Sequence, residues 1–96
     1  MKQVNIALQI LPQSNSKDAY DIVDEAIALI RDSGIKYQVT PFETVMEGDY
    51  DRIMKLVKEI QIKCYEFGAE SIIANLKIQS RKNIDVTIDD KMHKYK

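Results

Sequence analysis

The sequence has few of the residues that most often build metal, disulfide or nucleophilic sites. Its 96 residues include one cysteine, one histidine and no tryptophan. Cys64 has no partner for a disulfide within the chain, which favours a reducing compartment, and we expect the protein in the cytoplasm. His93 stands alone among lysines, which argues against a histidine-based triad or metal site. We therefore expect no metal, no cofactor and no enzymatic activity.

Clustered charge and long apolar runs are also missing. The formal net charge is −1, and the acidic and basic residues are spread along the chain. Nucleic acids and anionic membranes need grouped lysines and arginines, so neither is an expected partner. No run of about eighteen apolar residues predicts a membrane-spanning helix, and the N-terminal residues do not have the apolar core of a signal peptide.

Two segments near opposite ends of the chain alternate apolar residues with amides and small residues. The first covers residues 3–11, and the second runs from Glu70 to about Ser80. Side chains alternate across a strand, so each segment has an apolar face for a core and a second face that carries amides. The amides are Asn5, Gln9, Asn75 and Gln79. Because amides both donate and accept hydrogen bonds, the second face suits a polar ligand or a partner subunit.

The remaining elements follow from spacing and from helix and turn signals. Apolar residues at three- and four-residue intervals predict one helix between Ser16, its expected N-cap, and Gly34, and another between Asp49 and Gly68. Cys64 falls on the apolar stripe of the second helix and is expected in the core. Between the helices, 35–40 and 42–47 predict two short strands. A short helix is expected from about residue 88, since Thr87 and Asp90 resemble a capping box.

The order of elements predicts an α+β, ferredoxin-like sandwich with the order βαββαβ. We expect one domain over residues 1–96. Right-handed crossovers place both long helices on one face of a four-stranded antiparallel sheet. The other sheet face has only the short C-terminal helix to cover it, so we expect self-association into a homodimer or homotetramer.

Three familiar uses of this fold lack their residues here. A metal-chaperone loop needs a Cys-x-x-Cys motif, which is absent after the first strand. An RNA-binding sheet needs aromatics on its central strands, where this chain has amides and aliphatic residues. An acylphosphatase loop needs arginine and glycine, and residues 11–18 contain neither.

One stretch in the middle of the chain is the main candidate for a site: Tyr37-x-Val39-x-Pro41-x-x-Thr44-x-x-Glu47-Gly48-Asp49. Most of its residues have an ordinary structural role in a turn, a helix cap or the core. Thr44 and Glu47 are the two for which no such role is evident. A carboxylate on a central strand needs a partner, because an unpaired buried charge is costly. We favour a ligand or subunit contact for Glu47. A surface charge at the end of the strand is the alternative.

This stretch, together with QVNIALQILP and LKIQSR, resembles the small thiamine-binding proteins of the MTH1187/YkoF-like family. The resemblance covers residues 3–92. It implies the same ferredoxin-like fold, assembly through sheet faces, and binding of thiamine or its hydroxymethylpyrimidine moiety near the interfaces between subunits.

The resemblance also implies roles for individual residues. Thiamine joins a cationic thiazolium to an aminopyrimidine, so Glu47, with Glu43 as a second choice, is expected to face the charge. Tyr37, or Phe42 as the alternative, is expected to stack on a ring, and Gln9, Thr44 and Asn75 are expected to form hydrogen bonds. Two other hypotheses stay open. One is an oligomeric interaction module without a small ligand, and the other is an enzyme that uses Glu47 as a general base.

Overall fold

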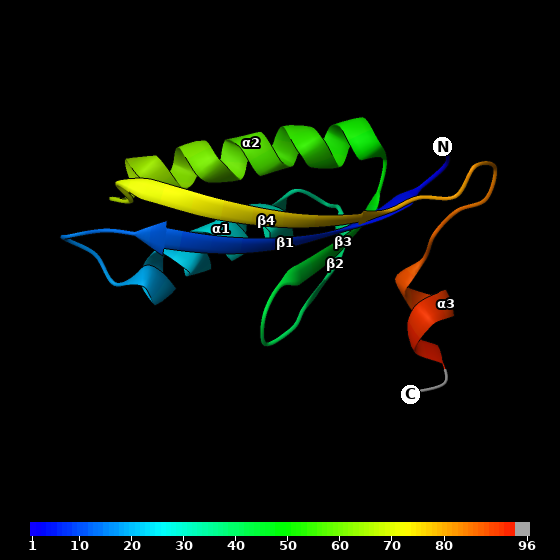
Figure 1. The fold of residues 1–96 in the computed structure, drawn as a ribbon, viewed down its shortest axis with the longest axis horizontal. Coiled ribbons are helices and arrows are strands. Elements are labelled where there is room, and N and C mark those ends of the chain that lie inside the picture. The colour runs from blue at the N-terminus through cyan, green and yellow to red at the C-terminus, as the bar shows by residue number, and fades with distance from the viewer. Residues whose placement is uncertain (94–96) are drawn as a thin grey trace.

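The computed structural model describes residues 1–93 and has the predicted ferredoxin-like arrangement (Figure 1). Residues 94–96, which the single-domain prediction includes, lie outside the described part. The sheet has the strand order β2-β3-β1-β4, and every neighbouring pair is antiparallel. The elements are β1 (Val4–Gln13), α1 (Ala19–Asp32), β2 (Lys36–Val39), β3 (Thr44–Gly48), α2 (Tyr50–Glu66), β4 (Ser71–Gln79) and α3 (Ile88–Met92).

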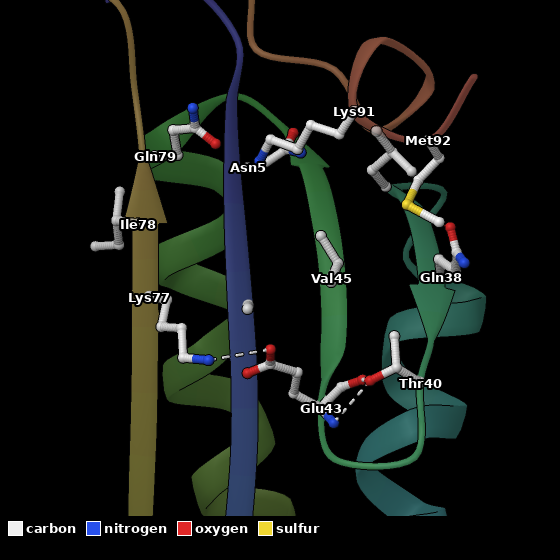
Figure 2. A pocket seen from close by; sticks show the side chains of 12 residues that line it. Asn5, Gln38, Thr40, Glu43, Val45, Lys77, Ile78, Gln79, Lys91 and Met92 are labelled. Atoms are coloured by element: carbon white, nitrogen blue, oxygen red, sulfur yellow. Dashed lines mark hydrogen bonds and ion pairs between the residues drawn. The ribbon is translucent and has the colours of Figure 1, made fainter. Parts of the chain in front are cut away.

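The long helices α1 and α2 lie together behind the sheet and cover one of its faces (Figure 2). The apolar residues of β1 alternate as predicted and point towards these helices, where Val4 and Ile6 are fully buried. Ile22 of α1 and Ile53 of α2 are also fully buried in this core. Removing such a side chain from water stabilises the fold by about 1.5–3 kcal/mol, so this layer is the main source of stability.

The helix ends are set by local hydrogen bonds, and one differs from the prediction. Asp49 caps α2 as expected, because its carboxylate accepts the backbone N–H of Arg52 at 3.0 Å. The N-cap of α1 is Asp18 rather than Ser16, and its carboxylate accepts the N–H of Tyr20 at 2.8 Å. Ser16 lies in the preceding turn, where its own N–H donates to the Ser14 hydroxyl.

Strand β1 continues past the predicted stop at Pro12. It pairs with β3 only as far as Leu8, while its pairing with β4 continues to Gln13. Beyond Leu8, β1 is therefore an edge on its β3 side, and proline is tolerated at such an edge. The strand therefore ends two residues beyond the predicted end at residue 11.

The short helix α3 forms where it was predicted and folds back over the open sheet face. The Thr87 hydroxyl accepts the N–H of Asp90 at 3.0 Å, as the capping pattern indicated. The segment before α3 lies beside the start of β1, where Val86 N–H donates to the carbonyl of Gln3 at 2.9 Å. Val86 and Ile88 are buried by this contact. Within residues 1–93, the open face therefore has a cover at one end only.

Within residues 1–93, none of the helices combines the length and the apolar character needed to cross a membrane.

Candidate functional site

Neighbouring strands place their open-face side chains in rows across the sheet. One row contains Lys36, Glu47, Asn5 and Gln79, because Glu47 pairs with both Lys36 and Asn5, and Asn5 pairs with Gln79. Directly opposed residues on antiparallel strands share a face and lie close together. This first row lies at the end of the sheet that α3 approaches.

The next row creates a hollow. It contains Gln38, Val45, Ala7 and Lys77 in register. Ala7 and Val45 are short, so the centre of the row is low, while longer side chains rise at both ends. The result is a pocket of about 360 Å³ on the open face, with α3 as one wall (Figure 2). Its lining residues are Asn5, Ala7, Gln38, Thr40, Glu43, Val45, Lys77, Ile78, Gln79, Ile88, Lys91 and Met92.

Glu47 holds this wall in place. Its carboxylate accepts the backbone N–H of Ile88 at 2.7 Å, and its second oxygen lies 3.7 Å from the Lys36 ammonium. Lys36 also binds the Asp89 carboxylate at 3.0 Å. A hydrogen bond to an ionised group is stronger than a neutral one. Glu47 therefore fastens the first turn of α3 to the sheet.

Asn5 makes a second attachment beside the first. With its amide oriented to satisfy both neighbours, Asn5 donates to the carbonyl of Val86 at 2.9 Å and accepts from the Lys91 ammonium at 3.0 Å. Asn5 is 3% exposed, so this amide needs both partners. The C-terminal segment is thus attached to the sheet at Val86 and at Lys91, on either side of Thr87, the N-cap of α3.

The two lysines near Glu47 differ in their electrostatics. The pKa of Lys36 is raised, chiefly by its hydrogen bond to Asp89 and further by the charge of Glu47. The pKa of Lys91 is lowered, because partial burial disfavours its ammonium, although the negative charge of Glu47 acts in the opposite direction. The surroundings of Lys36 therefore stabilise its charged form, whereas those of Lys91 destabilise it.

Glu43 and Lys77 form an ion pair across the pocket floor. The Lys77 ammonium lies 3.4 Å from the Glu43 carboxylate, and Figure 2 shows the two side chains reaching towards one another over β1. Thr40 fixes the backbone of Glu43, since its hydroxyl donates to the Glu43 carbonyl at 2.7 Å and accepts the Glu43 N–H at 3.1 Å. A turn therefore positions Glu43, whereas Lys77 lies on the edge strand β4.

Three of the five predicted site residues lie on the open face. Gln9 and Asn75 pair in register, and the Asn75 amide donates to the Gln9 carbonyl oxygen at 3.1 Å. They stand beyond the pocket lining, on the side away from α3. Glu47 lies under α3 with its carboxylate bonded to that helix, and it is also outside the lining.

Tyr37 and Thr44 lie on the opposite face, so the expectation that Thr44 would share a surface with Gln9 and Asn75 was wrong. Thr44 pairs with Leu8 and is buried, and Tyr37 pairs with Met46 and packs against the core. The sequence of the stretch from Tyr37 to Asp49 did not indicate which way each side chain points. The two glutamates of this stretch both reach the open face. Glu43 lines the pocket just before β3 begins, and Glu47 lies four positions further on, opposite Asn5.

Several lining residues were not predicted as site residues. Gln38 could have been predicted from the alternation along β2, because it lies on the face opposite to that of Tyr37. Lys77 could have been predicted in the same way, because it alternates with the apolar residues of β4 and shares a face with Asn75. Lys91 and Met92 had no such signal, since periodicity does not tell where a short helix packs. Among residues 1–93, no three or more metal-ligating side chains group together as a candidate metal site.

The fold and pocket define a class: a ferredoxin-like domain with a cavity suited to a small organic molecule on its open sheet face. A family model described as "Thiamine-binding protein" matches residues 6–96, and the chain belongs to this family.

Relatives support the assignment over the full length. The chain is 41% identical to the UPF0045 protein CPE1503 of Clostridium perfringens over 96 residues, which is all of both chains. A solved structure of a DUF77 domain from Bacillus cereus superposes with a TM-score of 0.95 at 40% identity, over 99% of this chain and 91% of that one. A structure from Thermotoga maritima, TM0486, superposes at 0.89 with 30% identity, over 98% and 99%. TM0486 is named as a candidate protein of thiamine biosynthesis or salvage.

Proposed function

We propose that the open-face pocket binds thiamine or its hydroxymethylpyrimidine moiety, and that the protein sequesters, buffers or delivers this ligand in the cytoplasm without transforming it. The observation that carries the proposal is a 360 Å³ pocket that mixes an apolar floor with amides and one carboxylate, in a chain of the thiamine-binding family. Small-molecule sites have volumes of about 300–1,000 Å³ and the same mixed character.

The lining suits both halves of the ligand. Ala7 and Val45 offer a flat apolar floor for a ring, and the Met92 thioether can contact an aromatic edge favourably. Gln38 and Gln79 supply amides, which match the paired donors and acceptors of an aminopyrimidine. We assign Glu47 an indirect role: it positions α3, which carries Met92. This replaces the contact with a ligand or a subunit that we expected for Glu47 from the sequence.

Gln9 and Asn75 belong to a second part of the proposal. They lie between the pocket and two exposed apolar side chains, Leu11 and Ile73, which pair across β1 and β4. We propose that this strip of the open face meets a second copy of the chain in a homodimer or homotetramer. The pocket would then lie at the margin of the interface.

Calorimetric titration with thiamine and with hydroxymethylpyrimidine tests the ligand. We expect saturable heat from the native protein and at least a tenfold loss of affinity in Val45→Phe, because the larger ring fills the floor of the pocket. Val39→Phe is the control, since Val39 is another valine on a strand, is 49% exposed and does not line this pocket. An absence of heat with both ligands at millimolar concentration would refute the proposal.

A second candidate is an interaction module with no small ligand, and the exposed pair Leu11 and Ile73 favours it. It predicts an oligomer that binds neither compound. An enzyme is separated from both by recovering the ligand after long incubation. Unchanged thiamine in the mass spectrum contradicts turnover.

A further inference from the structure

We propose that Glu43 selects the cationic thiazolium of the ligand, and that Lys77 is a displaceable counter-ion that occupies its place in the empty pocket. This inference rests on the proposed function and adds to it the group that reads the charge of the ligand. It gives a role to the ion pair between Glu43 and Lys77, which neither packs in the core nor holds α3 on the sheet.

The carboxylate of Glu43 is held ready for a cation. The two hydrogen bonds with Thr40 fix both peptide groups of Glu43, so its side chain starts from a rigid turn. That side chain is 23% exposed, and among the described residues that line the pocket Glu43 is the one acidic residue. A sheltered carboxylate interacts with a cation more strongly than one in open water, because the local dielectric constant is lower.

Lys77 is a weak occupant of the same place. Its side chain is 79% exposed, and its nitrogen lies 3.4 Å from the carboxylate, whereas strong ionic hydrogen bonds measure about 2.7–2.9 Å. Such a pair contributes little, because the exposed Lys77 side chain loses conformational freedom and hydration when it is held against the carboxylate. The ammonium can therefore return to water when another cation reaches Glu43, and the carboxylate is not left unpaired.

The other charged groups near the pocket are less suited to this role. Glu47 already accepts from Ile88 and faces Lys36. Lys91 lies at the α3 end, bound to Asn5, and would repel a thiazolium placed there. A thiamine molecule is thus oriented with its cation towards Glu43 and its pyrimidine towards the amide of Gln79 and the wall of α3.

The exchange predicts a difference between a charged and a neutral ligand. Thiamine carries the permanent cation, and hydroxymethylpyrimidine does not. In Glu43→Gln we expect thiamine to bind about tenfold more weakly or worse, as for the loss of a hydrogen bond to a charged group, while hydroxymethylpyrimidine stays within about twofold. In Lys77→Met we expect thiamine to bind about two- to fivefold more tightly, because its competitor is gone.

Calorimetry on the full chain measures all of these affinities. Glu59→Gln, the same charge change on the exposed side of α2, is the control and should leave both ligands unaffected. Equal losses for the two ligands in Glu43→Gln would overturn the inference, because Glu43 would then read the pyrimidine or support the fold. Weaker thiamine binding in Lys77→Met would also overturn it.

Failure of the proposed function looks different from failure of this inference. If the native protein binds neither ligand, the vitamin assignment fails. The charge exchange is then tested with N-methylthiazolium alone, by following the carboxyl carbon of Glu43 in the ¹³C NMR spectrum. A saturable shift that is absent in Glu43→Gln supports a cation site, and an unchanged signal refutes it.

Discussion

At the scale of single residues, Cys64 shows how burial removes reactivity from a side chain that sequence alone marks as notable. The thiol lies in the core on α2, with its sulfur 4.0 Å from the carbonyl of Ile22. Burial raises the pKa of the Cys64 thiol, and the negative charge of Glu25 raises it further. The prediction that Cys64 is a core residue is confirmed.

This shift makes stability depend on alkaline pH. The folded state resists losing the thiol proton, so the contribution of Cys64 is intact below the unfolded pKa of about 8.5 and is lost as pH rises beyond it. We expect the free energy of unfolding by urea to decrease between about pH 8 and pH 10, and to decrease less in Cys64→Ala. Identical slopes for the two proteins would contradict this role.

At the scale of elements, α3 depends on the sheet for its existence. It has five residues, and so short a helix is not stable alone in water. The hydrogen bond from Ile88 N–H to Glu47 and the burial of Val86 and Ile88 hold it in place. The wall of the pocket therefore depends on the Glu47 carboxylate, on the Asn5 amide and on the burial of these two apolar side chains.

Changes at Glu47 should therefore act first on α3. We expect Glu47→Ala to lower the free energy of unfolding by about 1–3 kcal/mol, since it leaves the Ile88 N–H without its acceptor. Glu47→Gln keeps an acceptor oxygen and should cost less. Urea denaturation gives the stability, and faster hydrogen exchange at Ile88 locates the loss. Protection at Ile88 that is unchanged in Glu47→Ala would contradict the assignment.

The elements also show where sequence was sufficient and where it was not. The alternation in β1 and the helical spacing in α1 and α2 were strong enough to predict the order of elements and the apolar core. Strand β3 has only five residues, and either of its faces would have been acceptable for Thr44 or Glu47. Its register depends on pairing with Leu8 and Asn5, far away in the chain. The site residues on β3 therefore depended on tertiary contacts that no local pattern contains.

At the scale of the whole molecule, the open sheet face is unevenly covered. Helix α3 shelters the end near Asn5, while Leu11 and Ile73 at the other end are 43% and 59% exposed. Strand β4 forms an edge of the sheet in the described part of the chain. Single exposed apolar residues are common on protein surfaces, whereas adjacent ones such as this pair can form a contact between subunits.

A charge at this end should separate the copies if they meet there. We expect Ile73→Lys to change an oligomer into an 11.1 kDa monomer in light scattering, because a lysine cannot be buried in an apolar contact without a partner. Ile62→Lys, an exposed isoleucine on α2, is the control. A native protein that is already a monomer would refute the proposed assembly.

The attachment of α3 to Gln3 and Asn5 has a consequence for the order of events during synthesis. A ribosome completes β4, and with it the apolar core, before it has made the residues that form the pocket wall. A chain cut just after β4 keeps every residue of this core but lacks the residues of the pocket wall. A complete pocket therefore forms only after the core and the wall have both folded, so in the proposed function ligand binding follows both events.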